Sequence, residues 1–294
     1  MTTIGFIGLG IMGGPMAANL VQAGYDVVGY NRSRGKVDRL VEQGGRPAAS
    51  VAEAVRGADI VVTMLPDSPD VEQIALGDDG VLTNAKDGIL YIDCSTIRPD
   101  TSRTVAEAAK DHGVRVLDAP VSGGEAGAVD GTLSMMVGGE TADFEAARAV
   151  LDVVGGTVVH VGPHGAGQTV KAANQLIVAG TIEVVAESIV FLEAYGVDTE
   201  AAVKVLAGGL AGNRILDKKA AGMLAREYKP GFRAELHDKD LGIVAAAARE
   251  AGVTIPVGAL VAQLMGSLKA QGDGTLDHSA LLKLVEQLSG RTAS

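Results

Sequence analysis

The sequence is poor in the residues that mark several classes of protein. Of its 294 residues one is cysteine, none is tryptophan, and aromatic residues make up 3%. The single cysteine, Cys94, excludes an intrachain disulfide framework and suits a reducing compartment. The Cys/His spacing of a zinc site is also missing, because the five histidines are scattered along the chain. We therefore expect a cytoplasmic protein that holds no metal.

Positive charge is scarce as well, with 25 basic against 36 acidic residues and a formal net charge of −11. No dense cluster of Lys and Arg could neutralise a phosphate backbone, so we expect no nucleic-acid partner. Residues 1–25 and 251–268 carry no charge. The first stretch lacks the basic region of a secretory signal, and the second contains Pro256 and several glycines. We therefore expect no membrane segment in either of them.

Glycine, by contrast, is abundant: the 40 glycines are about 14% of the chain, against an ordinary ~7%. Hydrophobic residues at 47% and charged residues at 21% are globular proportions, so the chain can bury a core. Its length fits one large domain or two of ordinary size.

The first half of the chain alternates short β-branched runs with helical patterns, which is typical of a parallel sheet covered by helices. The predicted strands are residues 3–8, 26–30, 59–64, 89–93, 114–118, 134–137 and 157–161. After Val161 several glycines and a proline break the pattern, and the remainder reads as helix. The predicted domains are therefore residues 1–162 and 163–294.

The helical half begins with a long apolar segment, residues 168–195, which ends before Gly196. Apolar residues lie on most of its faces, so we expect a buried central helix. Further helices are predicted at residues 199–207, 213–225, 238–251, 256–270 and 279–287.

The first predicted strand runs into Gly8-Leu9-Gly10-Ile11-Met12-Gly13, a G-x-G-x-x-G sequence followed by a helical pattern. In a dinucleotide-binding turn Gly8 permits the tight turn, Gly10 lets the backbone approach a pyrophosphate, and Gly13 allows close packing of helix on strand. The phosphates would lie at the helix N-terminus, which favours an anion. A purely structural glycine turn is the alternative.

The second strand ends at Asn31-Arg32-Ser33, where an NAD-binding fold usually places an acid for the ribose 2′-hydroxyl. No acid is present. Arg32, with Asn31 and Ser33, could instead hold a 2′-phosphate, so NADPH is favoured over NADH. Alternatively, Arg32 is a solvated loop residue.

Three further positions could carry chemistry. The run Asp118-Ala119-Pro120-Val121-Ser122-Gly123-Gly124 closes a strand with small residues that could bind a carboxylate, unless it is an ordinary glycine-rich turn. Lys171 lies one turn into the apolar helix, with Asn174 on the same face. Lys171 and Lys239 could each also be a solvated residue at the start of a helix.

Taken together, these residues resemble the β-hydroxyacid dehydrogenase family. The matching segments are residues 5–13, 93–97, 118–124, 165–171 and 239–241. Residues 173–175, 208–212, 229–233 and 277–281 look like its tartronate semialdehyde reductase branch. Gln175 departs from the commonest family pattern, which has a second asparagine there, but the branch shares it.

The resemblance implies an α/β fold in which a Rossmann-type doubly wound sheet is followed by an all-α domain, with the active site between them. It also implies a catalytic acid/base, Lys171, which Asn174 positions together with the substrate. The substrate carboxylate would bind to Ser122, Gly123 and Gly124. The other implied cofactor contacts are Leu65, Pro66, Thr96 and Lys239, beside Gly8, Gly10, Ile11, Met12 and Gly13.

We expect NAD(P)H-dependent reduction of a small carboxylate-bearing aldehyde, tartronate semialdehyde, to its hydroxyacid. A 3-hydroxyisobutyrate dehydrogenase or another small 3-hydroxyacid dehydrogenase is the alternative within the family. A dinucleotide-binding module without enzymatic activity is the alternative outside it. By resemblance we also expect a homodimer or homotetramer, with the long apolar helix as the interface.

Overall fold

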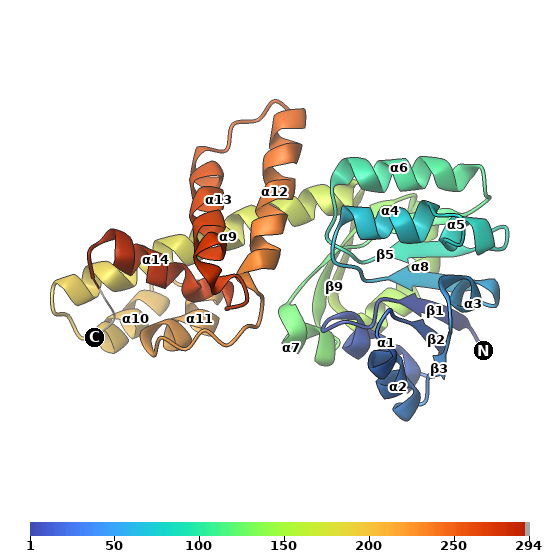
Figure 1. Cartoon of the computed structure of the whole chain (residues 1–294), viewed down its shortest axis with the longest axis horizontal. Coiled ribbons are helices and arrows are strands. Elements are labelled where there is room, and N and C mark those ends of the chain that lie inside the picture. Colours follow the sequence, from blue (N-terminus) through green and yellow to red (C-terminus); the bar gives the residue numbers. More distant parts are fainter. Residues whose placement is uncertain (292–294) are drawn as a thin grey trace. The chain divides into compact units, whose positions relative to one another are not determined.

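The computed structural model describes residues 1–291, which form two compact units that divide between Lys171 and Ala172 (Figure 1). The first unit contains a sheet of nine strands: β1 (Thr3–Ile7), β2 (Asp26–Tyr30), β3 (Arg46–Pro47), β4 (Ile60–Thr63), β5 (Leu90–Asp93), β6 (Arg115–Asp118), β7 (Val121–Ser122), β8 (Leu133–Gly139) and β9 (Gly155–Gly162). Its helices are α1 (Gly13–Gln22), α2 (Arg34–Glu42), α3 (Val51–Arg56), α4 (Ser68–Leu76), α5 (Val81–Asn84), α6 (Pro99–Lys110), α7 (Gly124–Val129) and α8 (Thr141–Val154).

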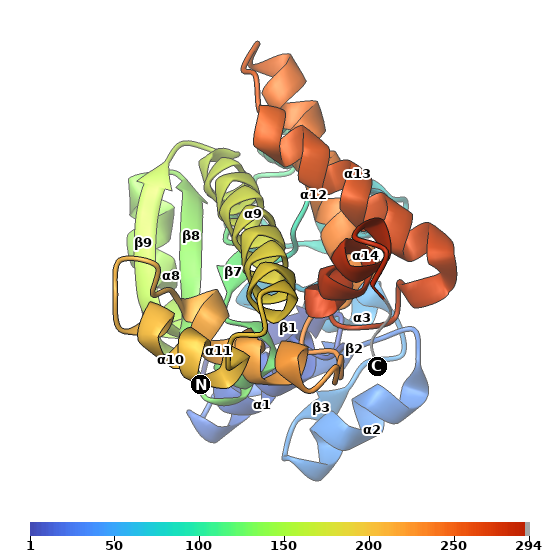
Figure 2. The same cartoon turned by 90° about the vertical axis from the view of Figure 1, so that its left-hand side faces the viewer.

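The strands lie in the order β3-β2-β1-β4-β5-β6-β8-β7, and β9 pairs with β8. The pairs from β3 through β6 are parallel, whereas β8 runs antiparallel to β6 and β7. Strands β8 and β9 lie side by side in Figure 2. The strand order 3-2-1-4-5-6 is that of a Rossmann-type sheet. The predicted fold class is thus confirmed, and the expectation of a parallel sheet is wrong at β8.

Helices pack against both faces of the sheet. Successive residues of a strand point to opposite faces, so neighbouring residues enter different apolar clusters. Phe6 and Ile92 belong to one apolar cluster, which includes residues of α1 and α8. Ile7 and Tyr91 belong to the other, which includes residues of α3 and α6. This double burial explains why the strands appear in the sequence as unbroken apolar runs.

All seven predicted strands are present. Only the two-residue strands β3 and β7 were not predicted, because two residues are too few to show either alternation or an apolar run. The pattern changes from strand to helix between β9 and the next helix, at residues 163–165. The boundary after residue 162 is kept as a proposal.

Helices make up the second unit: α9 (Ala166–Ala194), whose first residues belong to the first unit, α10 (Thr199–Ala207), α11 (Arg214–Leu224), α12 (Ala234–Glu250), α13 (Pro256–Leu268) and α14 (Leu281–Leu288). A π-helical segment, η1 (Lys269–Asp273), and a 3₁₀ turn, η2 (His278–Ala280), precede α14. Helices α12 and α13 pack against each other along their lengths (Figures 1 and 2).

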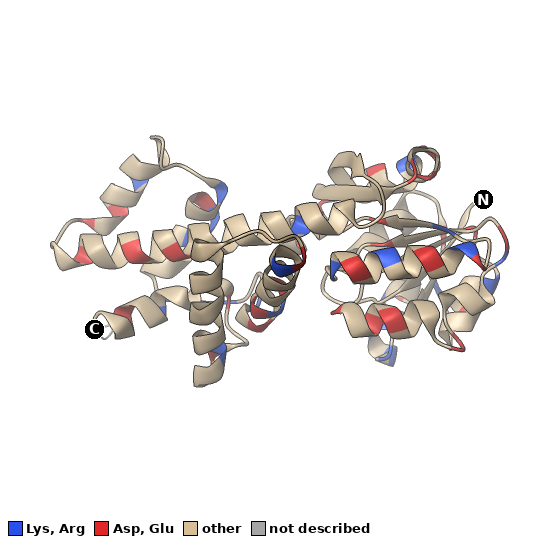
Figure 3. Cartoon of the chain, turned by 90° about the horizontal axis from the view of Figure 1, so that it is seen from above, with Lys and Arg blue, Asp and Glu red and all other residues tan. Residues whose placement is uncertain are grey.

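Helix α9 is buried along only one face. Ala179, Ile182 and Ala186 are fully buried, but Val184 is 57% and Phe191 62% exposed. The prediction of a buried central helix is therefore wrong for the face that carries Val184 and Phe191. The sequence shows that this face is apolar, but it does not show whether the same chain covers it. Acidic residues occur only in the later turns (Figure 3). By length and composition α9 could cross a membrane, although 44% of its most apolar window is buried inside the protein.

Candidate active site

The glycine motif forms the turn between β1 and α1, and its three glycines have three different surroundings. Gly8 has a φ of +98°, and a Cβ there would lie 2.3 Å from the Met64 carbonyl oxygen. A Cβ on Gly13 would lie 2.0 Å from the Gly8 carbonyl oxygen. A Cβ on Gly10 would meet no described atom within 4 Å. Gly8 and Gly13 are thus required by packing, whereas Gly10 borders open space.

That open space lies at the N-terminus of α1, which fits an anion. The first turn of α1 contains no acidic residue, and the residue before it, Met12, makes no side-chain cap. The N–H groups and the dipole of the helix therefore have no competing negative charge within the motif. Ile11, beside this space, is 56% exposed and Met12 is half-buried.

The residues predicted to hold a 2′-phosphate follow β2. The side-chain oxygen of Asn31 accepts a hydrogen bond from the Leu9 N–H at 3.0 Å, so it fastens this loop to the glycine turn. Ser33 is exposed. The Arg32 side chain is 78% exposed and its guanidinium lies 3.6 Å from the Asp70 carboxylate. Arg32 is therefore a surface cation beside the turn.

Leu65, Pro66 and Thr96 follow β4 and β5, and these loops are joined by a buried carboxylate. The Asp93 Oδ1 accepts from the hydroxyl groups of Thr63 at 2.7 Å and Ser95 at 2.6 Å. Ser95 Oγ in turn accepts from the Leu65 N–H at 2.8 Å. Since β2, β1, β4 and β5 are adjacent and parallel, the structure brings all the predicted cofactor residues of this unit to one edge of the sheet.

A residue that the sequence analysis did not single out, Gln168, fixes the loop that carries Thr96. Its amide donates to the Ser95 carbonyl at 2.8 Å and accepts from the Ile97 N–H at 3.1 Å, so it binds the peptide groups on either side of Thr96. Gln168 is 1% exposed. A glutamine in the first turn of an apolar helix, three residues before Lys171, was the available signal.

Asp118, at the end of β6, holds the start of α9. Its two oxygens accept from the backbone N–H groups of Gly165 at 2.8 Å and Gln168 at 3.0 Å. Burial raises the pKa of this carboxyl to about 6, although both backbone hydrogen bonds act in the other direction. In the sequence Asp118 stands out only as the first residue of the glycine-rich run.

Lys171 is buried, with 7% of its surface exposed, and its ammonium donates to the Val121 carbonyl oxygen at 2.7 Å. The interpretation of Lys171 as a solvated lysine is therefore wrong. The residue after Val121 is Ser122, which is half-buried, and Gly123 and Gly124 follow with φ values of +147° and +67°. The structure thus brings the lysine to the run predicted to bind a carboxylate.

The two remaining predicted residues lie in the second unit and belong to one network. Asn174 Nδ2 donates to Gln175 Oε1 at 2.7 Å, Gln175 Nε2 donates to Asp240 Oδ2, and the Lys239 ammonium lies 2.9 Å from Asp240 Oδ1. Helix α12 begins at Ala234, four residues before the predicted start. Lys239 is therefore not an exposed residue at a helix start, and its side chain is 19% exposed.

Comparison with known proteins gives the following matches. The family model described as the NAD binding domain of 6-phosphogluconate dehydrogenase matches residues 3–162. The model described as NAD-binding of NADP-dependent 3-hydroxyisobutyrate dehydrogenase matches residues 165–285. Within residues 1–291 no group of three His, Cys, Asp or Glu side chains could hold a metal ion.

Three individual proteins are similar to the chain over nearly its whole length. The 2-hydroxy-3-oxopropionate reductase of Escherichia coli is 39% identical, covering 97% of this chain and 98% of its own. The 3-hydroxyisobutyrate dehydrogenase of Pseudomonas aeruginosa is 42% identical, with the same coverages. The structure of Mycobacterium tuberculosis 3-hydroxyisobutyrate dehydrogenase with L-serine superposes with a TM-score of 0.89, at 36% identity, over 97% of this chain and 99% of the other.

Proposed function

Since the chain belongs to the β-hydroxyacid dehydrogenase family, we propose that it reduces tartronate semialdehyde, or 2-hydroxy-3-oxopropionate, to D-glycerate. As a member of this family it is an NAD(P)-dependent 3-hydroxyacid dehydrogenase that acts on a CH–OH group. The observation that carries the proposed chemistry is the buried Lys171 ammonium beside the Ser122–Gly124 run. The reductase-like segments, which include Gln175, support this substrate.

The chemistry divides between cofactor and protein. When bound, the nicotinamide supplies the hydride that reaches the aldehyde carbon. As negative charge grows on the aldehyde oxygen, the Lys171 ammonium stabilises it and donates a proton to it, and in the reverse direction the neutral amine accepts that proton. The N–H groups and hydroxyl of Ser122, Gly123 and Gly124 hold the substrate carboxylate. Asn174 positions the substrate and the lysine.

The cofactor is a nicotinamide dinucleotide, and NADPH is the form that we propose. The open N-terminus of α1 at Gly10 suits the pyrophosphate. The exposed Arg32, with Asn31 and Ser33, suits a 2′-phosphate, because no acid follows β2. The other proposed contacts are Gly8, Ile11, Met12, Gly13, Leu65, Pro66, Thr96 and Lys239.

Replacement of the lysine tests the proposed acid/base role. We expect Lys171→Ala to abolish turnover while leaving NADPH binding measurable by fluorescence titration, because none of the proposed cofactor contacts is removed. Lys204→Ala, an exposed lysine on α10, is the matched control and should keep full activity. Substantial turnover by Lys171→Ala would contradict the role.

The substrate itself is tested by comparing kcat/KM for tartronate semialdehyde with that for methylmalonate semialdehyde, which carries a methyl group where the first carries a hydroxyl. A site with paired hydrogen-bond partners discriminates strongly for the hydroxyl, whereas an apolar site discriminates weakly. A clear preference for methylmalonate semialdehyde would replace our assignment by 3-hydroxyisobutyrate dehydrogenase. A dinucleotide-binding module without activity is not favoured, given the family.

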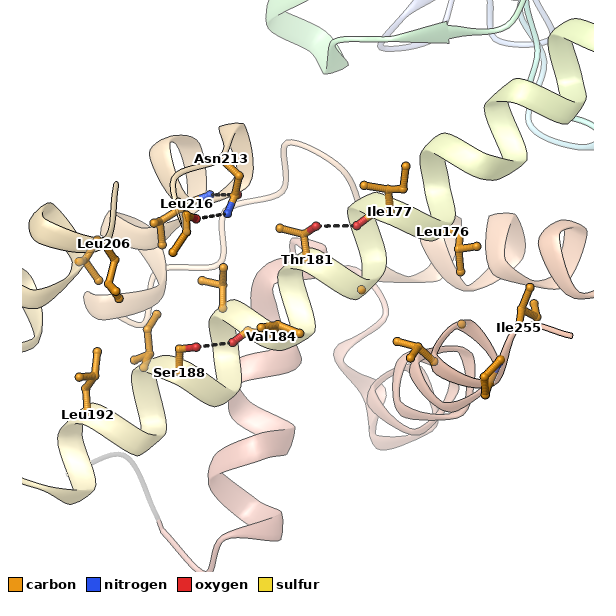
Figure 4. Close-up of a pocket in the computed structure, with 18 of the residues that line it drawn as sticks. Leu176, Ile177, Thr181, Val184, Ser188, Leu192, Leu206, Asn213, Leu216 and Ile255 are labelled. Carbon is orange, nitrogen blue, oxygen red and sulfur yellow. Dashed lines mark hydrogen bonds between the residues drawn. The ribbon is translucent and has the colours of Figure 1, made fainter. Parts of the chain in front are cut away.

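We also propose that the chain forms a homodimer or homotetramer through α9. In the second unit the exposed face of α9 borders an apolar groove of about 650 Å³ (Figure 4). On this exposed face of α9, large apolar residues recur at every seventh position, at Ile177, Val184 and Phe191. The smaller Thr181 and Ser188 lie between them. Both hydroxyl groups bond to their own helix, which leaves the surface apolar. Such a stripe suits the same stripe of a second copy.

Light scattering after gel filtration tests the interface. Val184→Asp should shift the protein toward the monomer, since it places a charge in the groove, and Gln287→Glu, on the exposed side of α14, should not. An unchanged mass for Val184→Asp would contradict this interface. The buried, unpaired Cys94 agrees with the proposed cytoplasmic location.

A further inference from the structure

The second unit contains a buried polar network that reaches beyond Asn174 and Lys239 to residues without a role in the proposed reaction. One arm runs from Asn174 through the side chain of Gln175 to Asp240, and the other runs from the backbone of Gln175 through His237 to His278. Gln175 is 4% exposed, Asp240 2% and His237 0%. Because unsatisfied polar groups at such depth are costly, a network of this kind fixes the orientation of its members.

Asp240 sets the direction of the first arm. A carboxylate only accepts hydrogen bonds, so it is the NH₂ group of Gln175 that faces Asp240 Oδ2. Gln175 Oε1 must then face Asn174 and accept from its Nδ2, at 2.7 Å. Asn174 consequently turns its own Oδ1 away from Gln175. One carboxylate, itself paired with Lys239, thus orients two amides in sequence.

The second arm holds the backbone of the same residue. His237 Nε2 lies 3.3 Å from the Gln175 carbonyl oxygen. A carbonyl oxygen can only accept a hydrogen bond, so His237 Nε2 is the donor and carries a hydrogen. The Nδ1 atoms of His237 and His278 lie 2.9 Å apart and share a hydrogen bond. Burial, together with His237, lowers the pKa of His278 to about 3, so His278 is neutral at physiological pH. The Phe232 ring packs edge-on against both imidazoles.

We propose that Gln175 is a positioning residue that keeps the Asn174 amide oxygen turned outward, as a hydrogen-bond acceptor in the reacting complex. The inference rests on the role given to Asn174 in the proposed function. An outward oxygen binds a donor, either the hydroxyl of the substrate or the Lys171 ammonium. A reversed amide would present N–H groups to that donor and repel it.

Gln175→Glu is the most informative variant, because the introduced carboxyl can replace the amide only when it is protonated. In that form its O–H donates to Asp240 while its carbonyl still accepts from Asn174. The ionised form loses the donor and repels Asp240. The charged and titratable groups around position 175 are His237, Lys239 and Asp240 on α12 and the Asp277–His278 pair at η2, and α13 contributes none.

We therefore expect Gln175→Glu to show one ionisation in its kcat–pH profile that the parent enzyme lacks. Activity should be within a few-fold of the parent at low pH and should fall as pH rises. Burial and the adjacent Asp240 raise the pKa of the new carboxyl above the ordinary ~4.3, into the range where activity can be assayed.

Gln175→Met keeps the volume but removes both hydrogen bonds, so kcat should fall roughly 100-fold at every pH, with KM for NADPH unchanged. If kcat falls more with tartronate semialdehyde than with methylmalonate semialdehyde, the donor to the Asn174 oxygen is the substrate hydroxyl. If kcat falls equally with both, the donor is Lys171. Gln287→Glu, an exposed glutamine on α14, controls for the added charge and should leave activity unchanged.

The inference is overturned if Gln175→Glu titrates like the parent and Gln175→Met keeps its kcat, while Asn174→Ala is inactive. If Asn174→Ala is itself fully active, the proposed role of Asn174 fails instead, so the two failures are distinguishable. Should Gln175→Met fold poorly, judged by circular dichroism, the Gln175→Glu profile still decides, because it compares one folded protein with itself across pH.

Discussion

The glycine turn offers a sharp separation between binding and packing, because alanine can be placed at two of its glycines with opposite consequences. At position 10 a Cβ meets no described atom within 4 Å, and the residue is not among the glycines with positive φ. At position 13 a Cβ would lie 2.0 Å from the Gly8 carbonyl oxygen. We therefore compare Gly10→Ala and Gly13→Ala for cofactor affinity and for stability.

Gly10→Ala should leave the fold intact, or stabilise it by about 0.4–1 kcal/mol, because alanine restricts the unfolded chain more than glycine does. Its methyl group would occupy the space of the pyrophosphate. Weakening one hydrogen bond to a charged phosphate costs roughly 1.5–3 kcal/mol. NADPH should therefore bind about 10-fold to 100-fold more weakly.

Gly13→Ala has to move the start of α1 away from the Gly8 carbonyl by about 1.4 Å, from 2.0 Å to the 3.4 Å of an ordinary carbon–oxygen contact. Since α1 buries Met16 and Leu20 in the core, we expect a cost of roughly 1–3 kcal/mol or more. The midpoint of thermal unfolding should fall by several degrees without cofactor, as measured by calorimetry.

Fluorescence titration with NADPH and calorimetry of both variants decide the matter. Unchanged NADPH affinity of Gly10→Ala would refute the placement of the pyrophosphate at this turn. Unchanged stability of Gly13→Ala would refute the packing argument.

Three further predictions concern charge and burial. Arg32→Ala should raise KM for NADPH far more than KM for NADH, and equal effects would remove the 2′-phosphate argument. Burial raises the pKa of Glu183 from 4.5 to about 7, so the native state holds a proton that the unfolded state loses first, and stability should decline as pH rises between these values. In urea titrations, the free energy of unfolding of Glu183→Gln relative to the parent should rise by roughly 2–3 kcal/mol between pH 4.5 and 7.5. If this difference between the two proteins is the same at both pH values, the raised pKa of Glu183 is contradicted. Cys94 is buried and its pKa is raised by that burial, so iodoacetamide should label it in guanidinium chloride but not in the native protein.

The parts of the molecule that could be predicted from sequence are those that local pattern determines. Seven strands appear as β-branched runs, and the glycine turn is specified by its own spacing. The residues that were missed act through distant partners. Gln168 bonds to a carbonyl 73 residues away and Asp118 to an N–H 47 residues away. A glutamine in the first turn of an apolar helix is a local signal, but nothing in the local sequence indicates the partner of either residue.

Burial was the other quantity that the sequence could not provide. Lys171 is charged yet buried, because the Val121 carbonyl receives its ammonium. Val184 is apolar yet exposed. Hydrophobicity alone predicts an exposed Lys171 and a buried Val184, and both predictions are wrong. Whether each side chain is buried depends on a partner: the Val121 carbonyl for Lys171, and the proposed second copy of the chain for Val184.

The chain is acidic, yet its proposed cofactor and substrate are anions. The hydrogen-bond partners of the buried carboxylates explain how the two are compatible. Asp118 accepts from the N–H groups at the start of α9, and Asp93 from two hydroxyl groups beneath the cofactor loops. Asp240 faces Lys239 and Gln175. Each of these charges is engaged with donors of the scaffold, while the first turn of α1 contains no acid. Negative charge inside the protein therefore orients the groups around the site and leaves the N-terminus of α1 without a competing acid in its first turn.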